Sequence, residues 1–177
     1  MNSKIFLAPH NDDETLFGAY IIMKEKPFVV ICTDSHSKEK NIIVTRRNES
    51  REAMDILGAE VWFLGIPNFA DAKMFRAMLE IRLSRLDNVE TVYAPNIDSS
   101  NIHHKVLGEV AKELFDNVIF YDTYKDSYGT TGIGKKVKHT AKMKLLKTKA
   151  MLKYKSQIEK ELTKKYFSEV WDEYTCR

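Results

Sequence analysis

The sequence has little cysteine: Cys32 and Cys176 are the two cysteines among 177 residues. Two cysteines do not make the disulfide framework of a small secreted protein, and their spacing excludes a Cys2His2 zinc site. Cys32 lies in an apolar run and is expected to be a buried thiol. Long apolar runs are also lacking, since the stretch from Phe28 to Cys32 is far too short to cross a bilayer. We therefore expect no membrane span.

Two further patterns are missing. No Gly-x-Gly-x-x-Gly follows the first apolar segment, so a dinucleotide cofactor is not expected. No signal-peptide pattern is present, because Met-Asn-Ser-Lys leads directly into that segment, and we expect a cytoplasmic protein. Hydrophobic residues make up 44% and charged residues 30%, which is typical of a globular protein. We predict a single domain spanning residues 1–177.

The net charge of +3 is small but unevenly distributed. Lysines gather between Lys135 and Lys155, where we predict a C-terminal basic helix over residues 142–163. A basic segment can bind phosphate, but a solvated helix face explains the lysines more simply. No aromatic-interleaved RNA-binding signature accompanies them, so nucleic acid is not the expected partner.

Short apolar segments alternate with amphipathic stretches along the chain. The first strand is expected at residues 5–8, and further strands are expected at residues 27–33, 59–65, 89–94 and 117–122. This alternation predicts an α/β fold, a Rossmann-like three-layer sandwich with a mostly parallel sheet of about five strands. In such sheets, ligands bind at the carboxyl ends of the strands.

An imidazole and three carboxylates follow the first strand directly, at the turn into a helix that begins near Asp13: His10, Asp12, Asp13 and Glu14. Carboxylates this close resist ionising together unless a cation compensates them. His10 and Asp13 are three positions apart and can reach one ion, and both residue types are ordinary ligands of zinc. An acidic helix start that faces the helix dipole is the alternative. Composition alone does not separate the two interpretations.

The stretch Leu7-Ala-Pro-His-Asn-Asp-Asp-Glu14 resembles a known signature. Ala/Pro-His-Pro-Asp-Asp-Glu is typical of the LmbE-like, or PIG-L, superfamily of zinc-dependent N-acetylglucosaminyl de-N-acetylases. Asn11 stands here in place of the usual proline. The stretch from Lys149 to Gln157 resembles a late Ser-Gln element of the same family, so the likeness covers most of the chain.

A helix from Thr45 to Gly58 also resembles the family, whose pattern there is Arg-x-x-Glu-x-x-x-Ala-x-x-x-Leu-Gly. Arg46 and Glu49 begin this pattern. An arginine at this place can contact the substrate or brace the acidic cluster. A surface arginine is the alternative.

A second stretch that is rich in possible ligand and catalytic residues runs from Asn96 to Gly108. It includes a helix that starts near His103. His103 and His104 lie about 100° apart on a helix, so we do not expect them to bind one ion together. The residues alone do not decide which of them binds. Alignment with the family's second motif makes His104 the ligand, places His103 where relatives have aspartate, and puts Asn101 where some have a histidine.

The resemblance implies hydrolysis of an N-acetylated amino sugar or glycoside with one divalent metal ion, zinc by expectation. His10, Asp13 and His104 are the implied metal ligands, with a position left open for water. Asp12 is the candidate general base, and Glu14 is expected to brace the helix start or a ligand. His103 is the candidate partner of the oxyanion, and the alternative is that it only supports a ligand or lies at the surface. Residues assigned to substrate binding are Arg46, Asn101 and Asp98, the last alternatively orienting an imidazole ring.

Two other functions remain open at this point. The fold can serve as a catalytically silent module that binds anions or nucleic acid through the basic helix. It can also serve as a metal-dependent phosphate ester hydrolase, which calls for a bridged pair of metals and more ligands than the sequence offers.

Overall fold

The computed structural model describes residues 3–34, 40–68, 71–126, 129–130, 134–159, 167, 170 and 172–176. Its centre is a seven-stranded sheet of order β3-β2-β1-β4-β5-β9-β8. Five strands are parallel: β1 (Lys4–Ala8), β2 (Phe28–Thr33), β3 (Val61–Ile66), β4 (Thr91–Pro95) and β5 (Val118–Tyr121). The antiparallel strands are β9 (Tyr174–Cys176) and β8 (Lys135–Lys136), and a separate hairpin consists of β6 (Tyr124–Asp126) and β7 (Gly129–Thr130).

The predicted α/β sandwich is confirmed, because all five predicted strands are the parallel ones. The helices are α1 (Asp13–Leu16), α2 (Ala19–Glu25), α3 (Lys40–Leu57), α4 (Ala72–Leu83), α5 (Ile102–Leu114), α6 (Ala141–Met151) and α7 (Lys155–Ile158). None of the helices within the described ranges combines the length and the hydropathy that crossing a membrane requires.

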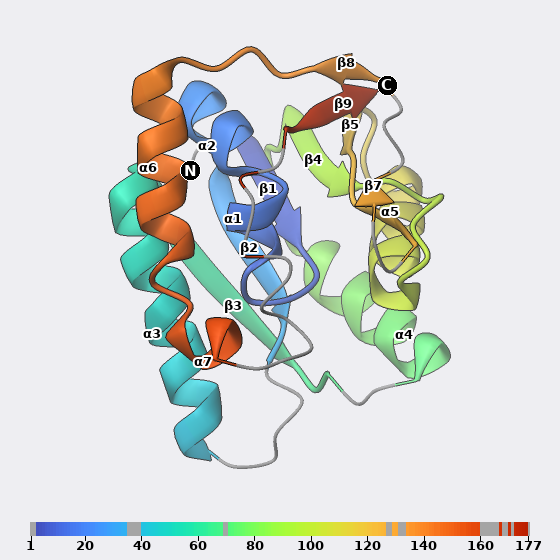
Figure 1. Cartoon of the computed structure of the whole chain (residues 1–177). Coiled ribbons are helices and arrows are strands. Elements are labelled where there is room, and N and C mark those ends of the chain that lie inside the picture. The colour runs from blue at the N-terminus through green and yellow to red at the C-terminus, as the bar shows by residue number, and fades with distance from the viewer. Residues whose placement is uncertain are drawn as a thin grey trace.

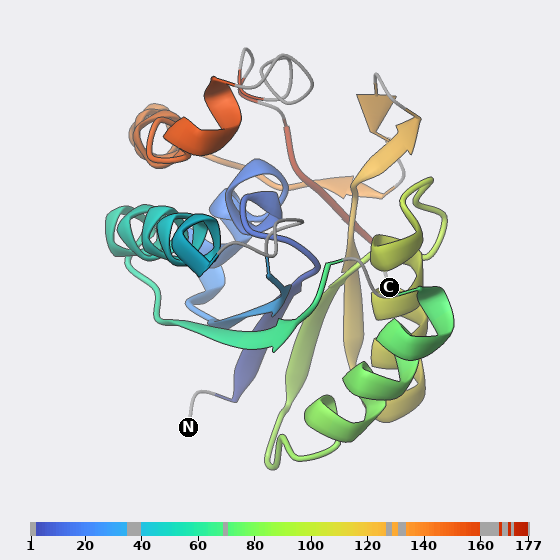
Figure 2. The same ribbon diagram turned by 90° about the horizontal axis from the view of Figure 1, so that it is seen from below.

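Alternate residues of β1 pack into opposite layers. Phe6 and Ala8 belong to the apolar cluster that includes residues of α1, α2, α3 and α6, whereas Ile5 and Leu7 belong to the cluster that includes residues of α4 and α5. Figures 1 and 2 show the sheet between these two helical layers. A strand covered on both faces must be apolar on both, which explains the uninterrupted apolar run of the first strand.

The order in which the chain adds parallel strands reverses beside β1. β2 and β3 extend the sheet on one side of β1, and β4 and β5 extend it on the other. The loops that follow β1 and β4 therefore open next to each other at one edge of the sheet, the place where open α/β sheets bind ligands. The two stretches that contain most of the candidate site residues, residues 10–14 and 96–108, lie in these loops and in the helices that follow them.

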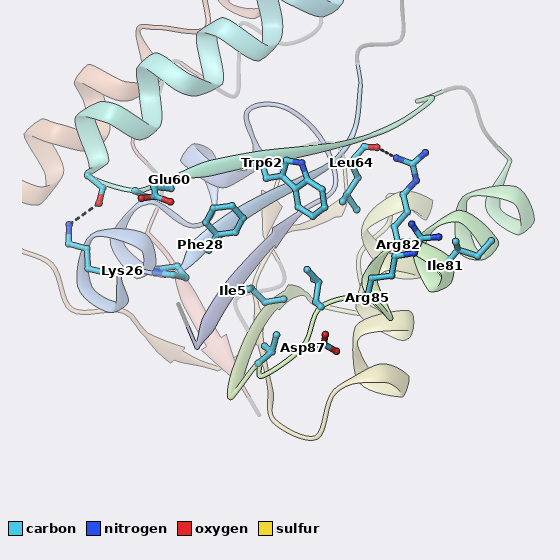
Figure 3. Close-up of a pocket in the computed structure, with 15 residues that line it drawn as sticks. Ile5, Lys26, Phe28, Glu60, Trp62, Leu64, Ile81, Arg82, Arg85 and Asp87 are labelled. Atoms are coloured by element: carbon cyan, nitrogen blue, oxygen red, sulfur yellow. Dashed lines mark hydrogen bonds between the residues drawn. The ribbon is translucent and has the colours of Figure 1, made fainter. Parts of the chain in front are cut away.

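A groove of about 1050 Å³ lies at the opposite end of the sheet (Figure 3). Ile5, Phe28 and Trp62 line it from the amino ends of three strands. No histidine or cysteine is among its lining residues, and its carboxylates, Glu60 and Asp87, are exposed. The groove lacks convergent ligand or acid–base groups, so we place the candidate site at the carboxyl ends of the strands instead.

The predicted basic helix over residues 142–163 is not one helix. α6 ends at Met151, and the short helix α7 begins at Lys155 after a turn, while residues 160–163 are outside the described ranges. Tyr154, in this turn, is fully buried in the core. The single-domain organisation stays a prediction.

Lys147 of α6 also departs from the prediction of a solvated basic face. Its side chain is fully buried, and Nζ donates to Glu173 Oε1 at 2.7 Å and to the Leu16 carbonyl at 2.8 Å. Glu173 in turn accepts hydrogen bonds from the backbone N–H groups of Tyr20 and Ile21 at the start of α2. This ion pair joins α6 and the C-terminal segment to the helices that follow β1.

We expect Lys147→Met to lower the free energy of unfolding by about 3–5 kcal/mol, because it leaves the Glu173 carboxylate buried without its cation. Urea denaturation measures the change. Lys149→Met, at an exposed position of the same helix, is the matched control and should change that free energy by less than about 0.5 kcal/mol. Equal losses in both variants would contradict a structural role for the ion pair.

Candidate metal centre

Three ligand-type side chains converge between the carboxyl ends of β1 and β4. His10 lies in the loop after β1, Asp13 is the first residue of α1, and His104 lies in the first turn of α5. Their donor atoms all lie within 4.8 Å of one another. Asp13 Oδ2 is 2.9 Å from His10 Nδ1 and 3.1 Å from His104 Nε2. Two imidazoles and one carboxylate around one point fit a single divalent ion of the zinc type.

Burial and the contacts within the set together determine its protonation. Burial lowers the pKa of His10 to about 4, so its ring is neutral at neutral pH. Burial by itself would raise the pKa of Asp13, but the charge of His104 and hydrogen bonds from both histidines outweigh it and hold that pKa well below its ordinary value. A neutral imidazole and an ionised carboxylate are the forms that bind metal ions.

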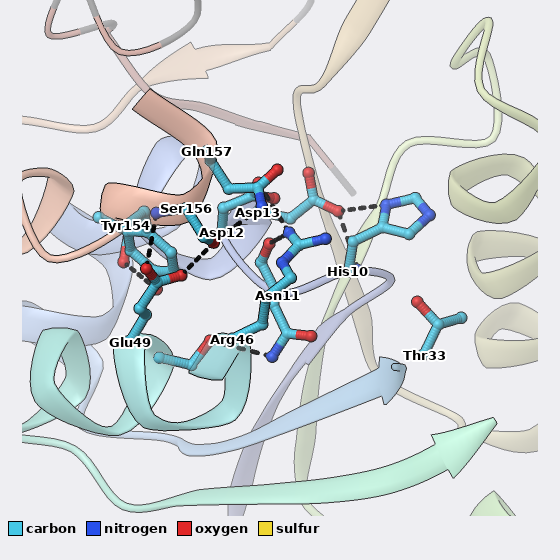
Figure 4. Close-up of polar contacts among 12 residues, drawn as sticks. His10, Asn11, Asp12, Asp13, Thr33, Arg46, Glu49, Tyr154, Ser156 and Gln157 are labelled. Atoms are coloured by element: carbon cyan, nitrogen blue, oxygen red, sulfur yellow. Dashed lines mark hydrogen bonds and ion pairs between the residues drawn. The ribbon is translucent and has the colours of Figure 1, made fainter. Parts of the chain in front are cut away.

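Asp12 lies beside this set, with different partners. Its φ of 111° is a positive value that residues other than glycine seldom adopt. Its Oδ2 lies 3.2 Å from Arg46 Nη2, whereas the Asp13 carboxylate faces His10, as Figure 4 shows. Burial raises the pKa of Asp12 well above its ordinary value, although the Arg46 guanidinium opposes the shift. The two adjacent carboxylates are therefore separated in orientation and in environment.

Arg46 is buried, so the alternative of a surface arginine is wrong: the residue is 7% exposed. Its Nη2 donates both to the Asn11 carbonyl and to Asp12. Asn11, which stands at the proline position of the family signature, donates from Nδ2 to Ser50 Oγ at 3.1 Å on the same helix, α3. Arg46 thus braces the acidic loop, one of the two roles predicted for it, and contact with a substrate stays a prediction.

Glu14 braces the start of α1. Its Oε2 accepts from the Asp12 backbone N–H at 2.9 Å, and its Oε1 accepts from the Tyr154 hydroxyl at 2.5 Å. Burial raises the pKa of Glu14 to about 7, and the hydrogen bond from Tyr154 partly offsets this rise. Sequence reasoning missed Tyr154, and the only signal near it was the family-like stretch from Lys149 to Gln157.

The structure brings His103 to the site but places it against His10. His103 Nδ1 lies 3.0 Å from His10 Nε2, and its ring centroid lies 4.6 Å from that of Phe75. The convergent set contains His104 rather than His103. That the two rings do not bind one ion together stays a prediction. A role for His103 at the oxyanion stays a prediction.

Asp98 lies in the loop between β4 and α5, and Asn101 ends that loop. Asn101 caps α5, since its Oδ1 accepts from the His103 backbone N–H at 2.9 Å. The backbone N–H of Asp98 donates to Asn96 Oδ1 at 3.1 Å. Asn101 therefore fixes the start of the helix that carries both histidines. Assignment of either residue to substrate binding stays a prediction.

The family model PIG-L: GlcNAc-PI de-N-acetylase matches residues 5–115, a range that includes all three convergent side chains. No curated protein sequence matches the chain. Among solved structures, N,N'-diacetylchitobiose deacetylase from Pyrococcus horikoshii has a TM-score of 0.68 and 17% identity, over 98% of this chain and 82% of that chain.

Two other solved structures are about equally similar. A40926 pseudoaglycone deacetylase Dbv21 has a TM-score of 0.69 and 16% identity, over 89% of this chain and 83% of that chain. GalB, the 4-carboxy-2-hydroxymuconate hydratase from Pseudomonas putida KT2440, has a TM-score of 0.67 and 16% identity, over 99% of this chain and 95% of that chain. At these identities the likeness shows the fold alone, and one of the proteins that share this fold is a hydratase.

Proposed function

The chain belongs to the PIG-L family, and on that premise we propose that it is a metal-dependent de-N-acetylase acting on an N-acetylated amino sugar or glycoside. The observation that carries the proposal is the convergence of His10, Asp13 and His104 beside a second carboxylate, that of Asp12, at the edge of the sheet where its parallel strands end. Family membership indicates which bond is cleaved. The site contains side chains of the types that amide hydrolysis needs, namely ligands for a metal ion and a carboxylate that can act as a base.

His10, Asp13 and His104 would hold one divalent ion. Zinc is the proposed ion because two imidazoles and a carboxylate are a common catalytic zinc set, although iron and cobalt accept the same ligands. An ion bound there would polarise the acetamide carbonyl and lower the pKa of a water ligand.

Asp12 is the proposed general base. It takes a proton from water as the water oxygen adds to the carbonyl carbon, and it returns that proton to the amine nitrogen as the carbon–nitrogen bond breaks. Acetate and the free amine are the products. The Arg46 guanidinium, 3.2 Å from Asp12 Oδ2, favours the ionised form of Asp12 that this step requires.

Further roles extend the proposal to groups around the reacting bond. His103 would donate a hydrogen bond to the carbonyl oxygen as negative charge develops on it. The residues assigned to the sugar are Arg46, Asn101 and Asp98. These assignments rest on the family resemblance and on the position of the residues around the metal set.

The proposal is tested by acetate release from N-acetylglucosamine and N,N'-diacetylchitobiose. We expect protein loaded with one equivalent of zinc to release acetate from an N-acetylated amino sugar. Removal of the metal with a chelator should abolish the release, and one equivalent of zinc should restore it. Zinc-loaded protein that releases no acetate from a panel of such sugars would contradict the proposed function.

The other two functions find less support. In the basic segment, Lys147 is buried, Lys136 lies 2.6 Å from Asp172, and Lys153 lies 3.0 Å from Glu52, so part of its charge is already compensated. A two-metal phosphatase needs ligands for a bridged pair of ions. Within the described ranges, a single group of three ligand-type side chains comes together.

A further inference from the structure

The backbone of Asp12 adopts a conformation that costs free energy. Its φ is 111° and its ψ is −33°, outside the regions that residues with a side chain prefer. Such a residue costs on the order of 1–3 kcal/mol and persists only where its surroundings hold it. The proposed base therefore stands at a position that other groups must maintain.

One of those groups is Glu14, whose side chain is fully buried two residues further on. Its Oε2 accepts the Asp12 backbone N–H at 2.9 Å. This contact is made to the main chain of Asp12 and leaves the carboxylate of Asp12 available. Glu14 therefore acts on the orientation of the Asp12 backbone and, through it, on the direction of the side chain.

A second group, Tyr154, holds Glu14 in turn. Its hydroxyl donates to Glu14 Oε1 at 2.5 Å and lies 3.1 Å from Thr15 Oγ1. Tyr154 is fully buried between α6 and α7, and 140 positions along the chain separate it from Glu14. The two oxygens of Glu14 therefore link the C-terminal segment to the Asp12 backbone.

We propose that Glu14 and Tyr154 are positioning residues for Asp12, with the Tyr154 hydroxyl fixing the Glu14 carboxylate that holds the Asp12 main chain in its strained conformation. The inference rests on the proposed function in one respect, that Asp12 is the base. The metal set has its own contacts, since Asp13 Oδ2 faces His10 and His104. Loss of the Tyr154 hydroxyl should therefore misplace the base and spare the metal.

Tyr154→Phe removes this hydroxyl and keeps the ring in the core. We expect kcat to fall roughly 10- to 100-fold, with KM and bound zinc unchanged, because a small misplacement of a reacting group has an effect of that size. In an Asp12→Asn background the same substitution should lower the residual rate no further. A purely structural role would lower the rate by the same factor in both backgrounds, and that result would overturn the inference.

Tyr121→Phe is the matched control. The Tyr121 hydroxyl is also buried and donates to a backbone carbonyl, that of Leu7, at 2.8 Å, so its removal takes away a comparable hydrogen bond that does not reach Asp12. We expect kcat to stay within about twofold of the wild-type value in this variant. If Tyr121→Phe lowers kcat as much as Tyr154→Phe does, the effect is general loosening of the core and the inference fails.

A readout that needs no activity separates this inference from the proposed function. Hydrogen exchange of the Asp12 amide, followed by NMR, should be at least tenfold faster in Tyr154→Phe than in the wild type, and unchanged in Tyr121→Phe. Unchanged exchange in Tyr154→Phe would overturn the inference even in an active enzyme. A zinc-loaded wild type that deacetylates nothing would overturn the proposed function, and the exchange rates would then decide the inference alone.

Discussion

Asp12→Asn is expected to lower kcat for acetate release by about 10²- to 10⁴-fold while zinc remains bound at about one ion per chain. Asparagine has nearly the same shape and keeps an oxygen that can accept from Arg46, which lies 3.2 Å from Asp12 Oδ2. Its carboxamide cannot take the proton of the attacking water. Because Asp12 is not in the convergent ligand set, its substitution should spare the metal.

Kinetics at saturating substrate and metal analysis of the same protein sample measure both effects of Asp12→Asn. Asp55→Asn is the matched control, since Asp55 is exposed on α3 and has no assigned role at the site. Activity of Asp12→Asn within tenfold of the wild-type activity would show that another group is the base. Loss of zinc together with activity would instead assign Asp12 to the metal.

His104→Ala is expected to abolish both metal binding and acetate release. It removes one of three donors, and His104 Nε2 is the nitrogen 3.1 Å from the shared Asp13 oxygen. A catalytic zinc site rests on three protein ligands, so two leave the ion weakly held. Metal content by mass spectrometry, after dialysis against one equivalent of zinc, measures the loss.

The neighbouring histidine provides the control for His104→Ala. His103→Ala should keep about one zinc ion per chain, because His103 contacts His10 at 3.0 Å and lies outside the convergent set. Circular dichroism should show folded protein for both variants. If His103→Ala loses the ion and His104→Ala keeps it, the second motif is misaligned by one residue.

The apolar pattern predicts the parallel part of the fold, because strands covered on both faces are continuously apolar. The same pattern carries no signal for β8 and β9. β8 consists of Lys135 and Lys136, and β9 has three residues from Tyr174 to Cys176, so both are too short and too polar for periodicity to indicate them. Their place in the sheet depends on pairing with β5 and with each other.

The sequence likewise predicts one part of the candidate site and gives no signal for the other. His10 and Asp13 are close in sequence, and the order of the strands brings the loop before His103 and His104 next to them, so local motifs and topology predict that these stretches meet. The choice of His104 over His103 depends on the family resemblance. The burial of Arg46 depends on how α3 packs over the loop after β1. The contact of Tyr154 with Glu14 joins positions 140 residues apart, and no local pattern indicates it.

Anomalous X-ray scattering at the zinc edge, from crystals of the zinc-loaded protein, tests the existence of the metal centre most directly. We predict one strong peak, about 2.0–2.2 Å from a ring nitrogen of His10, a carboxylate oxygen of Asp13 and a ring nitrogen of His104. A peak held by other residues, or no peak between the carboxyl ends of β1 and β4, would contradict the account.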